Sequence, residues 1–298
     1  MKNAIKYYYN LDPSTIHQKN NKYYFTVDKY NYVLLEYDDD KIEDIYNLSD
    51  NLLKIGVYSH KIIKNSMNSY VTLINDKNYV LLKIFVIKKQ ITVNDIINFN
   101  NIMYFNNNKL KINDWYMLWT NKVDYLEYQI NQLGKNYPLI IESFSYYIGL
   151  SEIAICLLKN INKNELYYSL GHKRISCDDT TYVFYNPLNI VIDLRIRDIC
   201  EYYKSCFFNN LSVDSLDNYL LYNNFTDSEA CCFLARMLFP TYYFDIYESI
   251  ISNQVKEEKI KKITDKVNDY EKFIKKIYLL LKSKYNIPSI EWLDAINY

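Results

Sequence analysis

The sequence predicts an α+β protein with two lobes: a small N-terminal lobe built on an antiparallel sheet and a larger C-terminal lobe made mainly of helices. Three observations support this prediction. Short β-like runs separated by turns fill the N-terminal third, a polar stretch at 105–114 interrupts the pattern, and apolar residues at helical spacing dominate afterwards. We place the boundary in the polar stretch, which gives an N-terminal lobe of residues 1–110 and a C-terminal lobe of residues 111–298.

The N-terminal lobe is expected to contain five strands and two helices. Residues 22–27 and 32–37 are rich in Tyr, Val and Phe, and the polar turn between them predicts a β-hairpin. Helical apolar spacing predicts a helix over 41–55, and a Thr or Asn cap precedes a short helix over 91–102. Three further strands are predicted over 57–65, 69–76 and 78–87, with residues 75–78 as the turn between the last two.

The C-terminal lobe is expected to be helical around a small group of strands. A helix over 115–134 ends at Gly134, and Pro138 opens the next, over 138–161. β-like sequence covers 166–176, 180–186 and 189–194. The remaining helices are predicted over 197–208, 212–223, 226–239, 240–251 and 257–285, the last as one long amphipathic helix.

Charge and cysteine usage narrow the class of protein. Lys plus Arg and Asp plus Glu both number 35, so the formal charge of zero gives no reason to expect a nucleic-acid partner. The N-terminus lacks the apolar run of a signal peptide, and no run of about 18 apolar residues predicts a membrane span. The six cysteines form no CxxC pair, and several sit in apolar helical sequence. We therefore expect a cytoplasmic protein with reduced core cysteines and no disulfides.

Three short segments, in chain order, each carry one candidate functional residue. The strand predicted over 78–87 carries one lysine, Lys83; a loop carries His172; and an apolar strand ends in Asp193 just before a helix. This order resembles the protein-kinase-like enzymes, most closely the aminoglycoside and choline phosphotransferase group. Within that group the chain is similar to spore-coat proteins of the CotS and YutH type, whose catalytic motifs are eroded.

A longer block supports the same resemblance. The sequence WTNKVDYLEYQINQLGKNYPLIIESFSYYIGLSEIAI is similar to the group's W-x-x-x-x-DY-E…P…S…Y-x-GL-x-E segment, and the whole resemblance covers about residues 20 to 250. It implies a two-lobed protein-kinase-like fold and ATP with Mg²⁺ as candidate cofactors. It also implies that Lys83 contacts nucleotide phosphate, that His172 is the loop histidine, and that Asp193 and Asp179 are candidate magnesium ligands.

The chain departs from the family pattern at the catalytic loop and at the glycine-rich segment that approaches the phosphates. The family loop reads His-Gly-Asp or His-Arg-Asp, whereas this chain reads His172-Lys173-Arg174. Arginine stays charged at physiological pH, so Arg174 cannot orient or accept the proton of an attacking hydroxyl. The segment over 23–32 also contains no glycine with which to approach a triphosphate. The resemblance therefore implies that no catalytic site is intact and that no cofactor is certain.

Each candidate residue also has a structural interpretation that the sequence leaves open. Lys83 fits an ordinary solvated strand lysine, His172 a hydrogen-bonded turn or core histidine, and Asp193 a cap for the helix that follows it. Arg197 and Asp198 fit an internal ion pair that orients this helix. Arg174 is expected to pair with a nearby aspartate such as Asp178, Asp179 or Asp193, with an internal cation in place of a metal.

The sequence thus favours a non-catalytic, pseudokinase-like binding or scaffold protein. The resemblance implies a protein partner such as a coat component, in the spore coat of a sporulating bacterium. The alternative is an active ATP-dependent phosphotransferase of small molecules that uses Asp179 or Asp193 in place of the missing base. A third interpretation, without the resemblance, is an interaction domain with surfaces rich in the chain's 34 tyrosines.

Overall fold

The computed structural model describes residues 1–19, 21–84, 89–102, 108–112 and 114–296. They form two compact units. The first unit comprises residues 1–111 and 170–192, and the second comprises residues 112–169 and 193–298. The sequence alone assigned residues 170–192 to the helical lobe, but in the structure they cluster with the N-terminal sheet.

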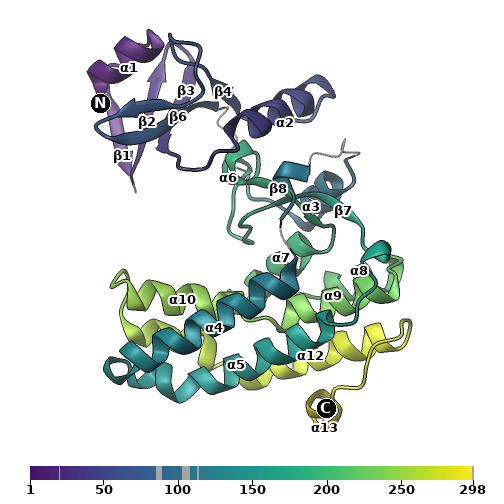
Figure 1. Ribbon diagram of the computed structural model, residues 1–298. Helices are drawn as coiled ribbons and strands as arrows, with labels where there is room; N and C mark the ends of the chain where they lie inside the picture. The colour runs from purple at the N-terminus through teal and green to yellow at the C-terminus, as the bar shows by residue number, and fades with distance from the viewer. Residues whose placement is uncertain (20, 85–88, 103–107, 113, 297–298) are drawn as a thin grey trace. The chain divides into compact units, whose positions relative to one another are not determined.

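The first unit is built on a six-stranded antiparallel sheet (Figure 1). Its strands follow the order β1-β2-β3-β6-β4, and β5 also pairs with β6. The strands are β1 (Ile16–Lys19), β2 (Lys22–Val27), β3 (Tyr30–Glu36), β4 (Lys61–Ile63), β5 (Thr72–Ile74) and β6 (Lys77–Ile84). The predicted antiparallel N-terminal sheet is therefore confirmed.

Tight turns fix the register of this sheet. Val27 lies opposite Tyr30, so only two residues join β2 to β3, and Asp28 takes a positive φ of 54°. Ile74 lies opposite Lys77, and Asn75 and Asp76 between them have φ values of 49° and 61°. Short polar side chains tolerate this left-handed conformation, which hairpin turns require. The turn predicted at 75–78 is confirmed.

The two faces of the sheet have different contacts. One face carries a hydrophobic cluster, which comprises Phe25, Tyr32, Leu34, Ile74, Tyr79, Leu81 and Ile5 of helix α1 (Lys2–Tyr9). Because strand side chains alternate, Val33, Val80 and Leu82 lie on the opposite face, and all three are completely buried. The sheet is thus buried on both faces over its central strands.

The two helices predicted for the N-terminal lobe begin close to where the sequence predicts, whereas helix α1 was not predicted. Helix α2 (Ile42–Lys54) follows β3, and helix α3 (Val93–Asn100) follows β6. Thr92 caps α3: its hydroxyl accepts from the Asp95 amide, while the Asp95 carboxylate accepts from the Thr92 amide. This reciprocal capping box satisfies donors that would otherwise lack partners in the first turn.

The segment 180–186 was predicted as β-like, which is wrong. It contains a short helix, α6 (Thr181–Phe184), in the first unit. Two buried histidines hold its carbonyl groups: His60 Nε2 lies 2.8 Å from the Tyr182 oxygen, and His172 Nε2 lies 2.9 Å from the Phe184 oxygen. These contacts come from residues distant in sequence, so they override the β propensity of the aromatic residues.

The second unit is helical, as predicted (Figure 1). Its main helices are α4 (Trp115–Leu133), α5 (Pro138–Leu158), α7 (Arg197–Phe208), α8 (Ser215–Tyr222), α9 (Asp227–Leu238), α10 (Thr241–Ile251), α12 (Val267–Lys282) and α13 (Glu291–Ala295). Helix α9 opens with a capping box between Thr226 and Glu229. The strands β7 (Tyr168–His172) and β8 (Ile190–Leu194) pair with each other and carry the chain between the two units.

The single long helix predicted over 257–285 is wrong. The chain forms a 3₁₀ turn at Glu257–Ile260 and a short helix α11 (Lys261–Thr264) before α12 begins at Val267. The break has a physical role, because Lys266 donates from Nζ to the carbonyls of Phe207 and Phe208, at 3.4 and 3.1 Å. A lysine at the carbonyl end of α7 satisfies groups that the helix cannot.

Helix α5 is the one helix of the described chain that is long and apolar enough to cross a membrane by length and composition, with a mean hydropathy of 1.4. The sequence analysis expected no span. Helix α5 contacts α9 and α4, and its buried residues include Ile140, Tyr147 and Ala154. This packing is that of a core helix in the second unit.

The buried His60 makes stability depend on pH. Its Nε2 must carry a proton to donate to the Tyr182 carbonyl, and its Nδ1 lies 3.0 Å from the Tyr58 hydroxyl. Burial lowers the pKa of His60, although the bond to Tyr182 partly opposes the shift. The unfolded chain therefore binds a proton more readily than the folded chain just below about pH 6.5.

We expect the free energy of unfolding to fall as the pH decreases below about 6.5. The reason is that His60 binds its second ring proton more readily in the unfolded chain than in the folded one. Urea unfolding between pH 7.5 and 5.5 measures this fall. The substitution His60→Gln should reduce the slope, whereas His17→Gln, at an exposed position, should not. Equal slopes for His60→Gln and the unaltered chain would contradict the assignment.

Candidate functional site

The candidate loop of the first unit begins at the end of β7. His172 is only 1% exposed, and its ring packs against Phe99 and Phe184 at centroid distances of 4.9 and 4.4 Å. Its Nε2 donates to the Phe184 carbonyl, because a carbonyl oxygen can only accept. His172 therefore positions the loop rather than presenting an imidazole to solvent.

Asn189 holds the next two residues of the loop. The Lys173 amide donates to the Asn189 carbonyl at 2.7 Å, and the Arg174 amide donates to Asn189 Oδ1 at 3.1 Å. The Asn189 side chain in turn donates to the Arg174 carbonyl at 2.8 Å. The backbone is thus ordered at the position where a phosphotransferase carries its catalytic aspartate, but the side chain there is an exposed guanidinium.

Asp179 lies five residues further along, at the position of the family's metal-binding amide. Its Oδ2 accepts from the Ser176 amide at 2.8 Å, which closes a local turn. Burial raises the pKa of this carboxyl, and the Ser176 bond only partly offsets the rise. The Asp179 carboxylate therefore accepts a hydrogen bond within its own loop, and its partly buried environment disfavours the ionised form.

Lys83 lies on β6, opposite Tyr32 of β3 and Lys61 of β4. Its ammonium group sits 3.2 Å from the centroid of the Tyr30 ring, a cation–π contact. Alternation along β6 places Lys83 on the same sheet face as Tyr79 and Leu81, which is the face that α1 covers.

The position of Lys83 in the strand order also differs from that of protein kinases. Kinases carry their phosphate-binding lysine on the third strand, before the first helix of the small lobe. The corresponding strand here, β3, reads YNYVLLE and has no lysine, while Lys83 follows helix α2. The correspondence drawn from the sequence is weakened, and phosphate binding by Lys83 stays a prediction.

The hairpins of the sheet have no long loops. Lys19 lies opposite Lys22, and Val27 lies opposite Tyr30, so two residues join each pair of strands. A phosphate loop needs several consecutive backbone amides that curve around an anion. The turn between β2 and β3, which is described throughout, is too short to provide them.

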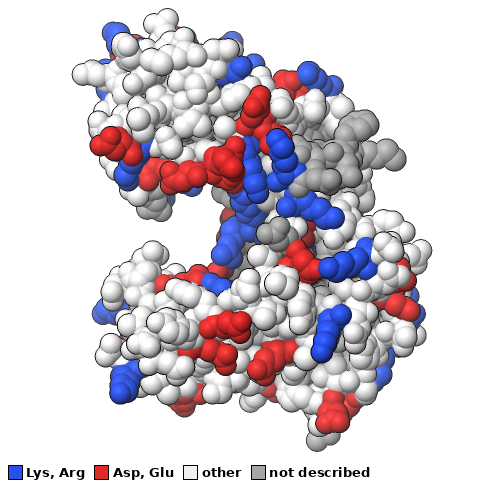
Figure 2. All heavy atoms as spheres, viewed as in Figure 1, with Lys and Arg blue, Asp and Glu red and all other residues white. Residues whose placement is uncertain are grey.

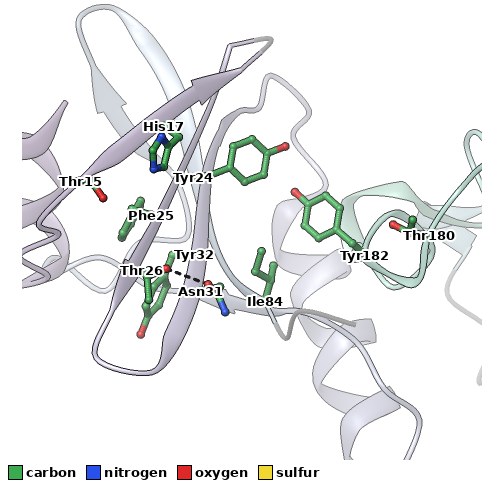
Figure 3. A pocket seen from close by; sticks show the side chains of 10 residues that line it. All are labelled: Thr15, His17, Tyr24, Phe25, Thr26, Asn31, Tyr32, Ile84, Thr180 and Tyr182. Atoms are coloured by element: carbon green, nitrogen blue, oxygen red, sulfur yellow. Dashed lines mark hydrogen bonds between the residues drawn. The ribbon is translucent and has the colours of Figure 1, made fainter. Parts of the chain in front are cut away.

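A cavity of about 600 Å³ lies against strands β1, β2, β3 and β6 of the first unit (Figure 3). Residues of both sheet faces contribute to its lining, together with Thr180 and Tyr182 of the segment that contains α6. The described lining residues are Thr15, His17, Tyr24, Phe25, Thr26, Asn31, Tyr32, Ile84, Thr180 and Tyr182. None of them is Lys, Arg, Asp or Glu.

In the second unit, Asp193 is almost fully buried, with 3% of its surface exposed. Its carboxylate accepts from Trp115 Nε1 at 3.0 and 3.3 Å and from the Leu194 amide at 2.7 Å. Arg197 Nε lies 3.3 Å from Asp193 Oδ2, an ion pair across one helical turn. Burial raises the pKa of Asp193, while Arg197 and Arg236 act in the opposite direction.

Further charged side chains extend this buried group, which we call the Asp193 cluster: Trp115, Asp193, Arg197, Glu201, Lys204 and Arg236. Glu201 Oε1 accepts from Arg236 at 2.6 Å and from Lys204 at 2.7 Å. Although burial would raise the pKa of Glu201, these two cations hold it well below its usual range. The Arg236 guanidinium also lies 4.9 Å from the Trp115 ring.

The sequence analysis missed most of the Asp193 cluster. The signal was present in α7, where Arg197, Glu201 and Lys204 recur at i, i+4 and i+7 and so share one helix face. Arg236 likewise interrupts an otherwise apolar helix. The Trp115 contact had no local signal, since 78 residues separate it from Asp193.

The predicted magnesium ligands Asp179 and Asp193 fall in different units, and a site that joins them stays a prediction. Lys83, His172, Arg174 and Asp179 belong to the first unit, and Asp193 belongs to the second. Within the described ranges no group of three or more His, Cys, Asp and Glu residues is placed to hold a metal ion. A metal at Asp193 would have to displace the Trp115 and Arg197 contacts.

Surface charge does not mark a second candidate. Acidic and basic side chains lie interspersed on the visible face of each unit (Figure 2). In the first unit, for example, Lys77 pairs with Glu36 at 2.7 Å and Lys173 pairs with Asp39 at 3.6 Å. Such mixing fits a chain with a formal charge of zero.

Solved structures share this fold. An aminoglycoside phosphotransferase from Alicyclobacillus acidocaldarius superposes with a TM-score of 0.68 and 11% identity, covering 95% of this chain and 96% of that one. A spectinomycin phosphotransferase, solved with ADP and spectinomycin, gives a TM-score of 0.65 and 12% identity over 94% and 97% of the chains. The kinase-like fold predicted from the sequence is therefore confirmed.

Sequence comparison narrows the relationship. The "Endospore coat-associated protein YutH" of Bacillus subtilis is 26% identical over 210 residues, which is 61% of this chain. The match spans 62% of that protein's length. Residues 2–277 match the family described as "Spore coat putative kinase YutH". The chain therefore belongs to the YutH family of spore-coat proteins, with the protein-kinase-like fold of the aminoglycoside phosphotransferases.

Proposed function

We propose that this chain is a non-catalytic, kinase-like binding protein associated with the spore coat, where it contacts other coat components. The observation that carries the proposal is the state of Asp193, which corresponds to the metal-binding aspartate of phosphotransferases. Its carboxylate is buried and shared between Trp115 and Arg197. An internal cation thus neutralises the charge that would otherwise recruit Mg²⁺.

Three features of the first unit support the same proposal. Arg174 brings a permanent positive charge to the position of the catalytic carboxylate. The described turn between β2 and β3 is too short to form a phosphate loop. Lys83 stacks on Tyr30, on the face of the sheet that α1 covers. Phosphoryl transfer relies on positioned cations and a metal around the phosphates, and each of these parts is altered here.

The alternative function is an ATP-dependent phosphotransferase of small molecules, with ATP and Mg²⁺ as cofactors. The ordered loop from His172 to Asp179 favours it, since that backbone is held in place by Asn189, Ser176 and Phe184. In this alternative Asp179 or Asp193 would orient the acceptor hydroxyl. The two functions differ in what Mg²⁺ and ATP do to the folded protein.

Thermal unfolding with ATP, in the presence of either Mg²⁺ or EDTA, separates the two functions. A site saturated a hundredfold above its Kd would raise the melting temperature by on the order of 5 °C. We expect no magnesium-dependent rise. A rise that requires Mg²⁺ and disappears in both Lys83→Ala and Asp193→Asn would overturn the proposal and support the phosphotransferase.

The structural role of Asp193 gives a second test. Removing its carboxylate in Asp193→Ala leaves the Arg197 guanidinium buried beside an unpaired Trp115 N–H. Loss of one partner of a buried ion pair costs about 3 kcal/mol, so the free energy of unfolding should fall by about that amount.

The matched control for this test is Asp124→Ala, at an exposed position on α4 in the same unit. Surface substitutions of this kind change the free energy of unfolding by less than about 0.5 kcal/mol. Chemical denaturation of both variants at pH 7 makes the comparison. If Asp193→Ala is as stable as Asp124→Ala, or more stable than the unaltered chain, Asp193 is not a structural residue.

A further inference from the structure

A second described cavity, of about 470 Å³, lies wholly within the second unit. The first turns of helix α5 form one wall, and the segment from Lys261 in α11 to Val267 at the start of α12 forms the other. Leu139, Tyr147 and Val267 supply apolar surface, and the volume is in the range of small-molecule sites, about 300–1,000 Å³. None of the described lining residues belongs to the Asp193 cluster or to the candidate loop, so this cavity goes beyond the proposed function.

Hydrogen bonds between distant segments hold the two walls of this cavity in place. The Ile140 amide in the first turn of α5 donates to Glu257 Oε1 at 3.0 Å, which ties the helix to the 3₁₀ turn before α11. The Tyr146 hydroxyl of α5 donates to Glu271 Oε1 of α12 at 2.9 Å. Tertiary contacts therefore build the cavity before any ligand enters, which lowers the cost of ordering its walls on binding.

Three charged side chains line the cavity without pairing with one another. Glu142 lies on α5, and Lys261 and Asp265 lie on the opposite wall. Within the ranges that the structure describes, none of the three makes an ion pair or a side-chain hydrogen bond. This holds even for Lys261 and Asp265, which are four residues apart, a spacing at which helical side chains can meet. The cavity therefore offers a ligand one positive and two negative groups beside apolar surface.

From this lining we propose that the cavity binds a free α-amino acid with an apolar side chain. The ammonium group of the ligand pairs with Glu142 and Asp265, its carboxylate pairs with Lys261, and its side chain contacts Leu139 and Val267. Charge-assisted hydrogen bonds are stronger than neutral ones, and the apolar contacts add buried area. A plain amine leaves Lys261 unpaired, and a plain carboxylate leaves both acidic groups unpaired. The mixed lining therefore favours the zwitterion over either.

Leucine, isocaproate and isoamylamine form a matched set of probes, because they share one isobutyl group and differ only in the charged groups beside it. Leucine carries both charges, isocaproate lacks the ammonium group, and isoamylamine lacks the carboxylate. We expect titration calorimetry at pH 7 to show leucine binding at least about tenfold more tightly than either analogue, the ratio expected for the loss of one charge-assisted pair.

Two substitutions at exposed positions assign the charges to their residues. Glu142→Gln should weaken the binding of leucine and of isoamylamine about fivefold, because the amide keeps a hydrogen bond but loses the charge. Lys261→Met should weaken leucine binding about tenfold and leave isoamylamine binding no weaker, because isoamylamine has no carboxylate for Lys261 to hold.

The matched controls are Glu152→Gln, at an exposed position on the same helix, and Lys259→Met, at an exposed position in the 3₁₀ turn. Neither residue lines the cavity. Both controls should leave the leucine Kd unchanged. Melting curves of every variant check that loss of binding is not loss of folding.

Two outcomes would overturn the inference. In the first, leucine does not bind at millimolar concentration, or neither Glu142→Gln nor Lys261→Met weakens its binding. In the second, isoamylamine binds as tightly as leucine and Lys261→Met strengthens both, so the cavity holds a plain cation. Neither outcome affects the proposed function, whose test uses ATP and Mg²⁺ and residues outside this cavity.

Discussion

The buried carboxylate of Asp193 is the constraint around which the second unit is organised. A carboxylate with 3% exposure is tolerable only when paired and hydrogen-bonded. The chain satisfies it with Arg197 one helical turn later, Trp115 from α4 and the electrostatic influence of Arg236 from α9. One side chain therefore fixes the end of β8 against the helices that follow and precede it.

The need to pair carboxylates of the second unit also explains where the chain places its few arginines. Lysine supplies nearly all the positive charge, and arginine occurs only at 174, 195, 197 and 236. Three of these four pair with carboxylates of the second unit: Arg195 with Glu229, Arg197 with Asp193, and Arg236 with Glu201. A planar guanidinium is less strongly hydrated than an ammonium group and suits buried pairing. The fourth, Arg174, lies exposed in the candidate loop of the first unit.

Local signals predicted much of the fold, and distant contacts account for the failures. The two-residue turns and the capping boxes at Thr92 and Thr226 depend on adjacent residues, so the sequence shows them directly. The helix at 181–184 depends on His60 and His172, and the break before α12 depends on Lys266 reaching α7. For the candidate site, the loop substitution at Arg174 could be predicted because the motif is contiguous. The role of Asp193 could not, because it depends on Trp115.

Phosphate recognition and ring recognition have different physical requirements. Holding a triphosphate requires cations, a metal and loop amides that converge on one space. Here three cations, Arg197, Lys204 and Arg236, lie inside the Asp193 cluster. Holding a ring requires only a flat apolar surface and a few oriented neutral donors. The sheet register supplies these through Tyr24, Asn31 and Ile84, without any charged group. The strands that line the cavity also build the core of the first unit, so both depend on the same sheet register.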